Sequence, residues 1–535
     1  MRTPSVTPVA PFQSVPPVPP RVALVVISRS HEVRPGGGTR RERGGYCWRE
    51  RFGGEGGVSL RARDRWVFVD GAWRACKGGG TRVVEDPSGA GAVGEAPLGD
   101  EKDVHDAVEA ARAAFPAWAR TAPAERGAAL RAMAARVRER ADELARLVTR
   151  EMGKPYGDAL GGVEAGAGTL EQYAELGPVH RGRSLQGAWD AADLMVLEPR
   201  GVVGVITPWN DPVAIACGLA GAALVTGNTV VHKPSERTPH TGALLVEIVA
   251  GELPPGVLNL VTGDGRAGEA LAGHEDLDVI AHVGSTAAGR RIAAAAARTG
   301  AKALLENGGK DPLIVDAGVD PEWAAEQAAI GCFANAGQIC TSVERIYVHE
   351  DVAGPFTEAL VRRARALRRG PGLGEGVELG PLVDRAQRDA VHRHVTGAVS
   401  AGARLLTGGE IPEGDGAFYP ATVLTDCSDE MELMSEETFG PVAPIRVVRS
   451  FDEALAAAAR SPYGLAAVVL TPSMANAQRA WRELPVGTVK VNAVFGGAPG
   501  GAAEPLRGSG RGFGYGPELL DEMTHTKVVH LSPPR

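Results

Sequence analysis

The chain has 535 residues, of which 44% are hydrophobic and 23% are charged, a composition typical of a globular protein with a large core. Its 57 basic and 65 acidic residues give a net charge of −8. This balance excludes the basic excess with which proteins hold nucleic acid through phosphate contacts. The six cysteines form no C-x-x-C pair and are accompanied by no histidine pair at zinc spacing. We therefore expect free thiols in a reducing, cytoplasmic compartment and no metal site.

Residues 1–64 differ in character from the rest of the chain. They contain eight Pro, nine Gly and eleven Arg, but no Lys and only five acidic residues, which gives a net charge of +6. No helical period runs through them, and the apolar run at 22–27 is too short for a secretory signal. We predict a disordered Pro/Gly/Arg-rich extension, with folded structure beginning near residue 65.

Strand and helix patterns follow in order. Aromatic and β-branched residues around Asp70-Gly71 predict a strand and turn at 66–73. Apolar residues spaced by three and four predict one amphipathic helix over 104–118 and a second that ends near residue 153. The longest apolar stretch, 213–227, has about fifteen residues. A membrane span needs roughly 20, so we expect a buried helix there and no membrane partner.

Beyond residue 201, short Val/Ile-rich runs alternate with helical patterns. This alternation predicts an α/β fold with parallel sheets and crossover helices, and ligand sites at the carboxyl ends of the strands. The predicted strands are 202–207, 229–232, 257–262, 279–283, 313–315, 345–348, 444–448, 467–470 and 488–491.

Two glycine-containing turns follow predicted strands and precede helices. Gly263-Asp-Gly265-Arg-Ala-Gly268 has the G-x-G-x-x-G spacing of pyrophosphate loops, but no acidic residue stands about 20 positions later to bind a ribose. It fits a plain turn as well as a phosphate site. The turn Gly284-Ser-Thr286 offers a close backbone approach, two hydroxyls and a helix N-terminus, and is the better phosphate candidate.

Cys340 follows a glycine-containing turn in Gly337-Gln-Ile-Cys340. A lone cysteine is most often a small buried hydrophobe. It becomes a nucleophile where a general base and an oxyanion donor stand beside it. The chain offers Glu306 and Asn210 for these two roles, although each by itself also fits a capping or turn residue.

Six ordered motifs resemble those of the aldehyde dehydrogenase superfamily. They are Thr207-Pro-Trp-Asn210, Lys233-Pro-Ser-Glu236, Gly284-Ser-Thr286, Glu306-Asn-Gly-Gly-Lys310, Gly337-Gln-Ile-Cys340 and Glu436-Glu-Thr-Phe-Gly-Pro441. Runs at 509–512 and 526–529 extend the match from about residue 66 to the end. The 34-residue separation of Glu306 and Cys340 also suits the family.

The resemblance implies a reaction and its catalytic residues. An aldehyde is oxidised to the free acid with NAD, or alternatively NADP, as the hydride acceptor. Cys340 attacks the carbonyl carbon and Asn210 stabilises the oxyanion together with the Cys340 backbone N–H. Glu306 then activates the water that hydrolyses the thioester.

The resemblance also implies the cofactor contacts. Lys233 and Glu236 hold the adenosine ribose hydroxyls, and the Glu236 carboxylate favours NAD because it repels a 2′-phosphate. Ser285 binds the pyrophosphate and Glu437 the nicotinamide ribose. The other residues implied at the cofactor site are Thr207, Trp209, Ser235, Gly284 and Phe439.

The chain departs from the family pattern at several positions near these motifs. Asp211 stands where an aromatic residue is common, and small residues occupy positions 214 and 218. His282 and Val283 precede the Gly-Ser-Thr motif, and Asn307 follows the catalytic Glu. Asp211 fits either an aldehyde entrance that favours cationic or strongly polar substrates or an ordinary salt-bridged carboxylate.

The architecture implied is an aldehyde-dehydrogenase-like α/β fold with three parts. A Rossmann-type dinucleotide-binding domain spans 65–180 and 200–308, and a catalytic domain spans 309–505. A small β oligomerisation element combines 181–199 with 506–535, where the terminal strand meets another subunit. The resemblance therefore implies a homodimer or homotetramer.

Two rival functions remain open from the sequence. Acylating relatives pass the thioester to coenzyme A and typically lack the hydrolytic Glu, so Glu306 favours a free acid. A non-catalytic structural member of the same fold would have no need of Cys340, Glu306 and Asn210 together. Neither argument identifies the aldehyde.

Overall fold

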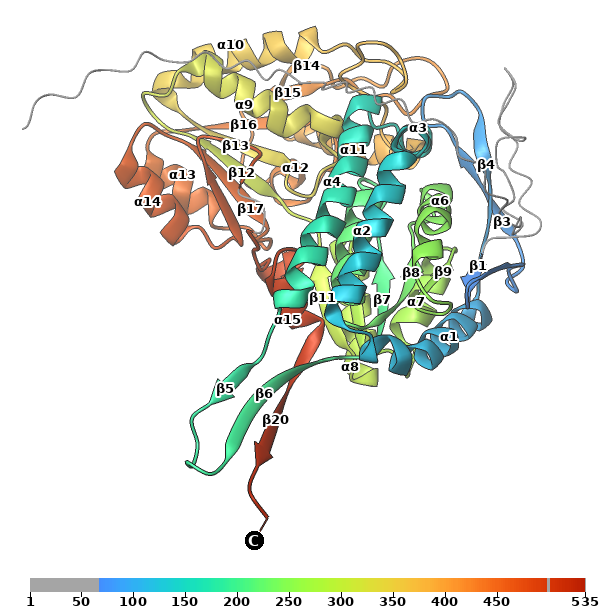
Figure 1. Ribbon diagram of the computed structural model, residues 1–535. Helices are drawn as coiled ribbons and strands as arrows, with labels where there is room; N and C mark the ends of the chain where they lie inside the picture. Colours follow the sequence, from blue (N-terminus) through green and yellow to red (C-terminus); the bar gives the residue numbers. More distant parts are fainter. Residues whose placement is uncertain (1–66, 498–500, 535) are drawn as a thin grey trace, which may run out of the picture. The chain divides into compact units, whose positions relative to one another are not determined.

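The computed structural model describes residues 67–497 and 501–534. The disordered extension predicted for 1–64 lies outside these residues. The described strands form four sheets, of eight, seven, three and two strands (Figure 1). The two larger sheets position the site.

The eight-stranded sheet has the order β19-β11-β10-β7-β8-β9-β1-β2. Strands β7 to β11 are parallel to one another, and the three outer strands are antiparallel to their neighbours. The inner strands are Val/Ile-rich and buried because helices cover both faces. Their bounds are β1 Val67–Val69, β2 Ala72–Arg74, β7 Val202–Ile206, β8 Thr229–Lys233, β9 Leu258–Val261, β10 Val279–Val283, β11 Lys302–Glu306 and β19 Gly510–Arg511.

Helices pack on this sheet in two layers. One core contains side chains of α1, α7 and α8, and the other contains side chains of α2 to α6 and Trp118 of α1. The apolar stretch predicted as a buried helix is α5. The bounds are α1 Glu101–Arg120, α2 Pro123–Glu139, α3 Ala141–Met152, α4 Tyr156–Leu176, α5 Pro212–Val225, α6 Pro239–Val249, α7 Gly265–Ala272 and α8 Thr286–Thr299.

The seven-stranded sheet has the order β14-β15-β16-β13-β12-β17-β18, and all its strands are parallel except β14. Its strands are β12 Asp311–Val315, β13 Val343–His349, β14 Arg404–Thr407, β15 Thr422–Thr425, β16 Val442–Val448, β17 Ala466–Leu470 and β18 Thr488–Val491. The accompanying helices are α9 Pro321–Phe333, α10 Glu350–Ala366, α11 Arg385–Ser400, α12 Glu432–Ser435, α13 Phe451–Ala458 and α14 Met474–Glu483.

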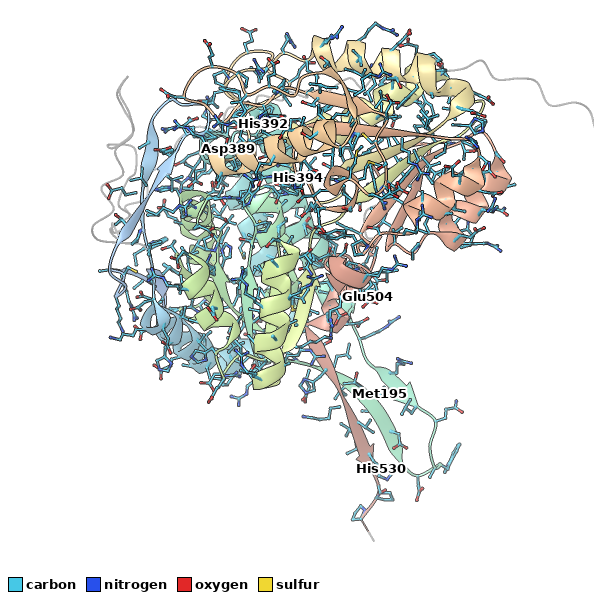
Figure 2. All side chains as sticks on the ribbon, turned by 180° about the vertical axis from the view of Figure 1, so that it is seen from behind. Met195, Asp389, His392, His394, Glu504 and His530 are labelled. Atoms are coloured by element: carbon cyan, nitrogen blue, oxygen red, sulfur yellow. The ribbon has the colours of Figure 1, made fainter. Side chains whose placement is uncertain are left out.

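The three-stranded sheet joins distant parts of the chain. β20 (Thr524–Leu531) pairs antiparallel with β6 (Ala192–Pro199), which pairs in turn with β5 (Arg183–Leu185). Met195 on β6 and His530 on β20 mark this pairing in Figure 2. The other late strand, β19, does not join this sheet but pairs with β11. The segment 506–535 is therefore divided between two sheets, unlike the single element expected.

The remaining elements are short. A two-stranded sheet consists of β3 Thr81–Glu85 and β4 Ala92–Pro97, and α15 Glu518–Glu522 leads into β20. The single-turn helices are η2 Gly177–Val179, η3 Ala250–Glu252, η4 Ala334–Gly337 and η5 Arg507–Ser509.

One predicted helix is wrong in its extent. The helix expected to end near residue 153 is two helices, α2 and α3, with Arg140 between them at φ −118° and ψ 25°. The apolar spacing continues across the break because both helices pack on α4. The side chain of Arg140 pairs with Glu143 and Glu247 at this corner.

Candidate active site

The predicted site residues follow four neighbouring parallel strands. Thr207 to Asn210 follow β7, Lys233 ends β8, Gly284 follows β10 and Glu306 ends β11. The sheet order 11-10-7-8-9 changes direction between β10 and β7. In open α/β sheets, ligands bind beyond the carboxyl ends of the strands at such a switch point.

Cys340 lies on the loop between α9 and β13, which belongs to the seven-stranded part of the fold. The loop turns sharply because Asn335, Ala336 and Gly337 have consecutive positive φ angles of 48°, 54° and 71°. A Cβ at position 337 would lie 2.1 Å from the carbonyl oxygen of Gly440, so only glycine fits there. This close approach holds the Cys340 loop against the segment that carries Glu437.

Asn210 links the two halves of the site. Its Nδ2 donates a hydrogen bond to the Gln338 carbonyl oxygen at 3.0 Å, and its side chain is buried. An amide nitrogen carries two N–H groups. One of them is held by the residue two positions before Cys340, which places the amide close to the Cys340 loop.

Glu306 lies against a glycine at the end of the chain. The backbone N–H of Gly514 donates to the carboxylate, and a Cβ on Gly514 would lie 2.2 Å from Glu306 Oε1. Burial raises the pKa of Glu306 to about 7. Burial, followed by repulsion from Glu306, raises the pKa of the Cys340 thiol to about 12. The carboxylate and thiol are therefore close enough to interact, and Glu306 is the one of the two groups that loses its proton near neutral pH.

The pKa of Glu306 gives an expected pH dependence. A general base acts only when it is deprotonated, so we expect steady-state turnover to rise with pH through about 7 and to level off above it. A pH profile of kcat measures this. The limb should disappear in Glu306→Gln, and a limb that survives in that variant would contradict the assignment.

The adenosine end of the predicted cofactor site contains a buried cation. The Lys233 side chain is 4% exposed, and its Nζ lies 3.7 Å from Glu236 Oε2, a distance longer than a hydrogen bond. Burial lowers the pKa of Lys233. A buried ammonium with one distant carboxylate needs further polar partners. The vicinal hydroxyls of a ribose fit this donor and acceptor pair.

The two candidate phosphate turns differ in charge. The Asp264 carboxylate caps α7 by accepting from the Arg266 N–H, so a negative charge already occupies that helix N-terminus. The neutral hydroxyl of Ser285 caps α8 instead, and the buried Thr286 Oγ1 beside it has no hydrogen-bond partner among the described residues. The α8 turn is therefore the one that suits a pyrophosphate.

Glu437 and Phe439 stand where the two sheets meet. The Gly309 N–H donates to Glu437 Oε1 at 2.9 Å, and burial raises the pKa of Glu437 to about 8. The Phe439 ring packs edge-on against Trp209, with ring centroids 5.4 Å apart. These contacts leave a carboxyl group and two aromatic rings beside the Cys340 loop.

The sequence did not indicate the buried contacts that hold residues 438 and 439, which we call the clamp. Glu344 accepts hydrogen bonds from the backbone N–H groups of Thr438 at 3.0 Å and Phe439 at 2.9 Å. It also pairs with Lys310 Nζ at 2.7 Å, and both side chains are buried. The clamp holds Phe439 at a positive φ of 51°.

Side chains of α11 complete the clamp. Gln387 Nε2 donates to the carbonyl oxygens of Thr438 and Phe439, each at 3.1 Å. His394, labelled in Figure 2, lies 3.2 Å from Thr438 Oγ1 through its Nδ1. Because the loop is held through its N–H groups, its carbonyls and a hydroxyl, Glu437 has a fixed position.

The departures near Asn210 now have local explanations. Asp211 Oδ1 lies 3.4 Å from Lys154 Nζ, so it is the salt-bridged carboxylate that the sequence left as an alternative. A Cβ on Gly218 would lie 3.5 Å from the Tyr515 ring, so an aromatic side chain from the chain end packs beside this small residue.

Comparisons with known proteins agree with this geometry. The model of the aldehyde dehydrogenase family matches residues 73–529. Betaine aldehyde dehydrogenase of Amaranthus hypochondriacus is 36% identical, over 85% of this chain and 94% of that protein. Peroxisomal aminoaldehyde dehydrogenase 2 of Pisum sativum is 37% identical, over 87% of this chain and 95% of that protein.

Solved structures are similar as well. Lactaldehyde dehydrogenase of Escherichia coli has a TM-score of 0.86 and 34% identity, over 88% of this chain and all of that chain. Betaine aldehyde dehydrogenase of Staphylococcus aureus, solved with NAD+, has a TM-score of 0.86 and 31% identity, over 89% and 96% of the two chains. The chain belongs to the aldehyde dehydrogenase family and has its fold, which confirms the resemblance. No helix of the described residues is long and apolar enough to cross a membrane.

Proposed function

We propose that this enzyme oxidises an aldehyde to the free carboxylic acid with NAD, and that Cys340, Asn210 and Glu306 are its catalytic residues. The observation that carries the proposal is the convergence of three groups. A thiol, an amide anchored two residues from it and a carboxyl group with a pKa of about 7 meet where two parallel sheets adjoin. Acyl transfer through a thiol requires such a set.

In the proposed first half-reaction, the Cys340 thiol gives its proton to solvent, and the thiolate Sγ attacks the aldehyde carbon to form the carbon–sulfur bond of the thiohemiacetal. The free N–H of Asn210 and the Cys340 backbone N–H stabilise the oxyanion of the thiohemiacetal, a contribution of about 2.7 to 4 kcal/mol per donor. NAD, when bound, supplies the hydride acceptor that makes this step an oxidation. Lys233, Glu236, the α8 turn and Glu437 would hold it.

In the second half-reaction, water hydrolyses the thioester on Cys340. Glu306 takes a proton from the water as its oxygen attacks the acyl carbon, and the carbon–sulfur bond breaks to release the acid and restore the thiol. The raised pKa of Glu306 suits a base that must act near neutral pH.

A coenzyme A-acylating activity is the second candidate. A panel of aldehydes assayed with NAD and NADP, with and without coenzyme A, tests both. We expect reduced nicotinamide without coenzyme A. An absolute coenzyme A requirement would overturn the proposed hydrolysis.

We expect NAD to be preferred over NADP because of Glu236. Its carboxylate can accept hydrogen bonds from both ribose hydroxyls but repels the 2′-phosphate of NADP. The ratio of kcat/KM for the two cofactors measures the preference, and Glu236→Gln should reduce it. A preference for NADP that Glu236→Gln leaves unchanged would refute this role, and Glu269→Gln, an exposed position on α7, is the matched control.

We also propose that β20 forms a subunit interface in a homodimer or homotetramer. Val528 and Leu531 on this strand are 67% and 56% exposed, and β20 is an edge of its sheet. Light scattering after size exclusion would measure the mass of the assembly. The five described cysteines are free, which fits the reducing, cytoplasmic compartment that we propose.

A further inference from the structure

Lys490 differs from the other lysines of the chain. The sequence has eight lysines, and six of them form an ion pair with a carboxylate. Lys102 is exposed on the outer surface of α1. Lys490 is half-buried, and within the described part of the chain its ammonium has no ion pair and no hydrogen bond; its Nζ lies over the Phe495 ring, 5.3 Å from the ring centroid.

The position of Lys490 places this cation near the proposed nucleophile. It lies on β18, in register with Val468 of the neighbouring strand β17. The Ala466 N–H at the start of β17 donates to Asp311 Oδ1 at 3.1 Å. A Cβ on Gly309 would lie 2.7 Å from that same oxygen and 3.0 Å from the carbonyl oxygen of Cys340. Burial lowers the pKa of Lys490, and Asp311 and Cys340 are close enough to oppose this shift by raising it.

The segment that carries Phe495, the aromatic partner of Lys490, is hydrogen-bonded to α9, the helix that precedes Cys340. Phe495 packs against the core of the seven-stranded sheet, and the N–H of its neighbour Val494 donates to Gln327 Oε1 on α9 at 3.3 Å. α9 ends just before the Cys340 loop. Lys490 and Cys340 are therefore both fixed to the seven-stranded sheet and its helix α9. The positive charge of Lys490 acts on a ligand that is bound covalently at Cys340 Sγ.

Among the described residues, no carboxylate forms an ion pair with this cation. Burial raises the pKa of Asp311 well above its ordinary value. Asp211 is paired with Lys154 at 3.4 Å. Two more carboxyl groups, Glu306 and Glu437, lie near Cys340, and burial raises their pKa values to about 7 and about 8. Lys490 is a cation near the thiol that no ion pair holds, and a cation there opposes a cationic substrate and attracts an anionic one.

We propose that Lys490 binds a carboxylate of the substrate, so that the preferred aldehyde is an oxo acid with an aldehyde at one end and a carboxylate at the other. The choice of substrate rests on the proposed function, whereas the recognition of an anion beside Cys340 does not. The betaine and aminoaldehyde dehydrogenases that the chain matches are named for cationic aldehydes. If this chain acted on the aldehydes in those names, it would prefer a cationic substrate to an anionic one.

Alkylation of Cys340 tests the charge without using the dehydrogenase reaction. Iodoacetate and iodoacetamide transfer similar groups to a thiolate but differ in charge, and mass spectrometry of the peptide distinguishes Cys340 from Cys332. We expect the rate ratio of iodoacetate to iodoacetamide to fall several-fold in Lys490→Met and to recover in Lys490→Arg. Lys102→Met, the same substitution at an exposed site, should keep the wild-type ratio. An unchanged ratio in Lys490→Met would overturn the proposal.

A substrate panel tests the same idea in turnover. We expect kcat/KM to decrease in the order 4-oxobutanoate, butanal, betaine aldehyde. The ratio of the first to the second should fall by on the order of tenfold in Lys490→Met, the size expected for loss of a hydrogen bond to a charged group. Betaine aldehyde ahead of 4-oxobutanoate would overturn the substrate assignment. If no aldehyde is oxidised but the alkylation ratio shifts, the proposed function fails and the anion site stands.

Discussion

Glu306→Gln should form the thioester once per active site and then nearly stop. Cys340 performs the attack, and hydride loss needs no carboxylate, whereas the hydrolytic water loses its base. Rapid mixing should give a stoichiometric burst of reduced cofactor followed by a steady state about 100- to 10,000-fold slower than in the parent enzyme, since proton transfer by a positioned side chain contributes about this much. The acyl group should be recoverable on Cys340.

Two controls separate this result from a general loss of structure. Cys340→Ser should give neither phase, because an unactivated hydroxyl is a poor nucleophile near neutral pH. Glu358→Gln removes a carboxylate from the exposed surface of α10 and should leave both phases intact. Parental turnover in Glu306→Gln would show that deacylation does not need Glu306. Absence of a burst while cofactor still binds would show that Glu306 acts before deacylation.

The parts of the fold that could be predicted are those set by local pattern. β7 and β10 are runs of Val and Ile buried on both faces, so their composition already predicts buried parallel strands. β11, with the sequence Lys-Ala-Leu-Leu-Glu, was not predicted because these residues favour helices. Its strand conformation comes from pairing with β10 and β19 on either side.

The gaps in the predicted site have a related cause. Glu306, Asn210 and Cys340 stand in short motifs whose chemistry can be recognised from residue type. Glu344 and Lys310 stand 34 residues apart, and Glu344 stands 94 and 95 residues from the N–H groups that it holds. No sequence spacing predicts a buried ion pair. These partners come together because β12 pairs with β13 in the sheet.

The α4–α5 contact illustrates the same limit on sequence reasoning. α4 was not predicted because its glycines weaken the helical signal. A Cβ on Gly166 would lie 3.3 Å from both Ala214 Cα and Cys217 Sγ of α5. The glycine that obscures the helix in the sequence thus allows α5, whose N-terminus follows Asn210, to pack closely on α4.

Asn210→Ala should lower kcat about 100- to 1000-fold with little change in cofactor binding. The substitution removes the side-chain N–H that we propose as an oxyanion donor, and the loss of one such donor typically costs about 2.7 to 4 kcal/mol. Because the oxyanion forms before hydride loss, the burst itself should become slow, unlike in Glu306→Gln, where only the later phase slows. Rapid mixing distinguishes the two variants, and nucleotide titration by fluorescence reports cofactor binding.

The control for this variant must remove a comparable amide elsewhere in the fold. Asn476 on α14 donates through Nδ2 to Asp316 Oδ2 at 2.7 Å and makes no contact with the proposed site. Asn476→Ala should lower the melting temperature but keep the parental burst rate. Asn210 also donates to Gln338, so its loss could instead displace the Cys340 loop. In that case alkylation of Cys340 would change together with the burst, whereas loss of the oxyanion donor alone leaves the alkylation rate near that of the parent enzyme. A parental burst rate in Asn210→Ala would remove Asn210 from the proposed catalytic set.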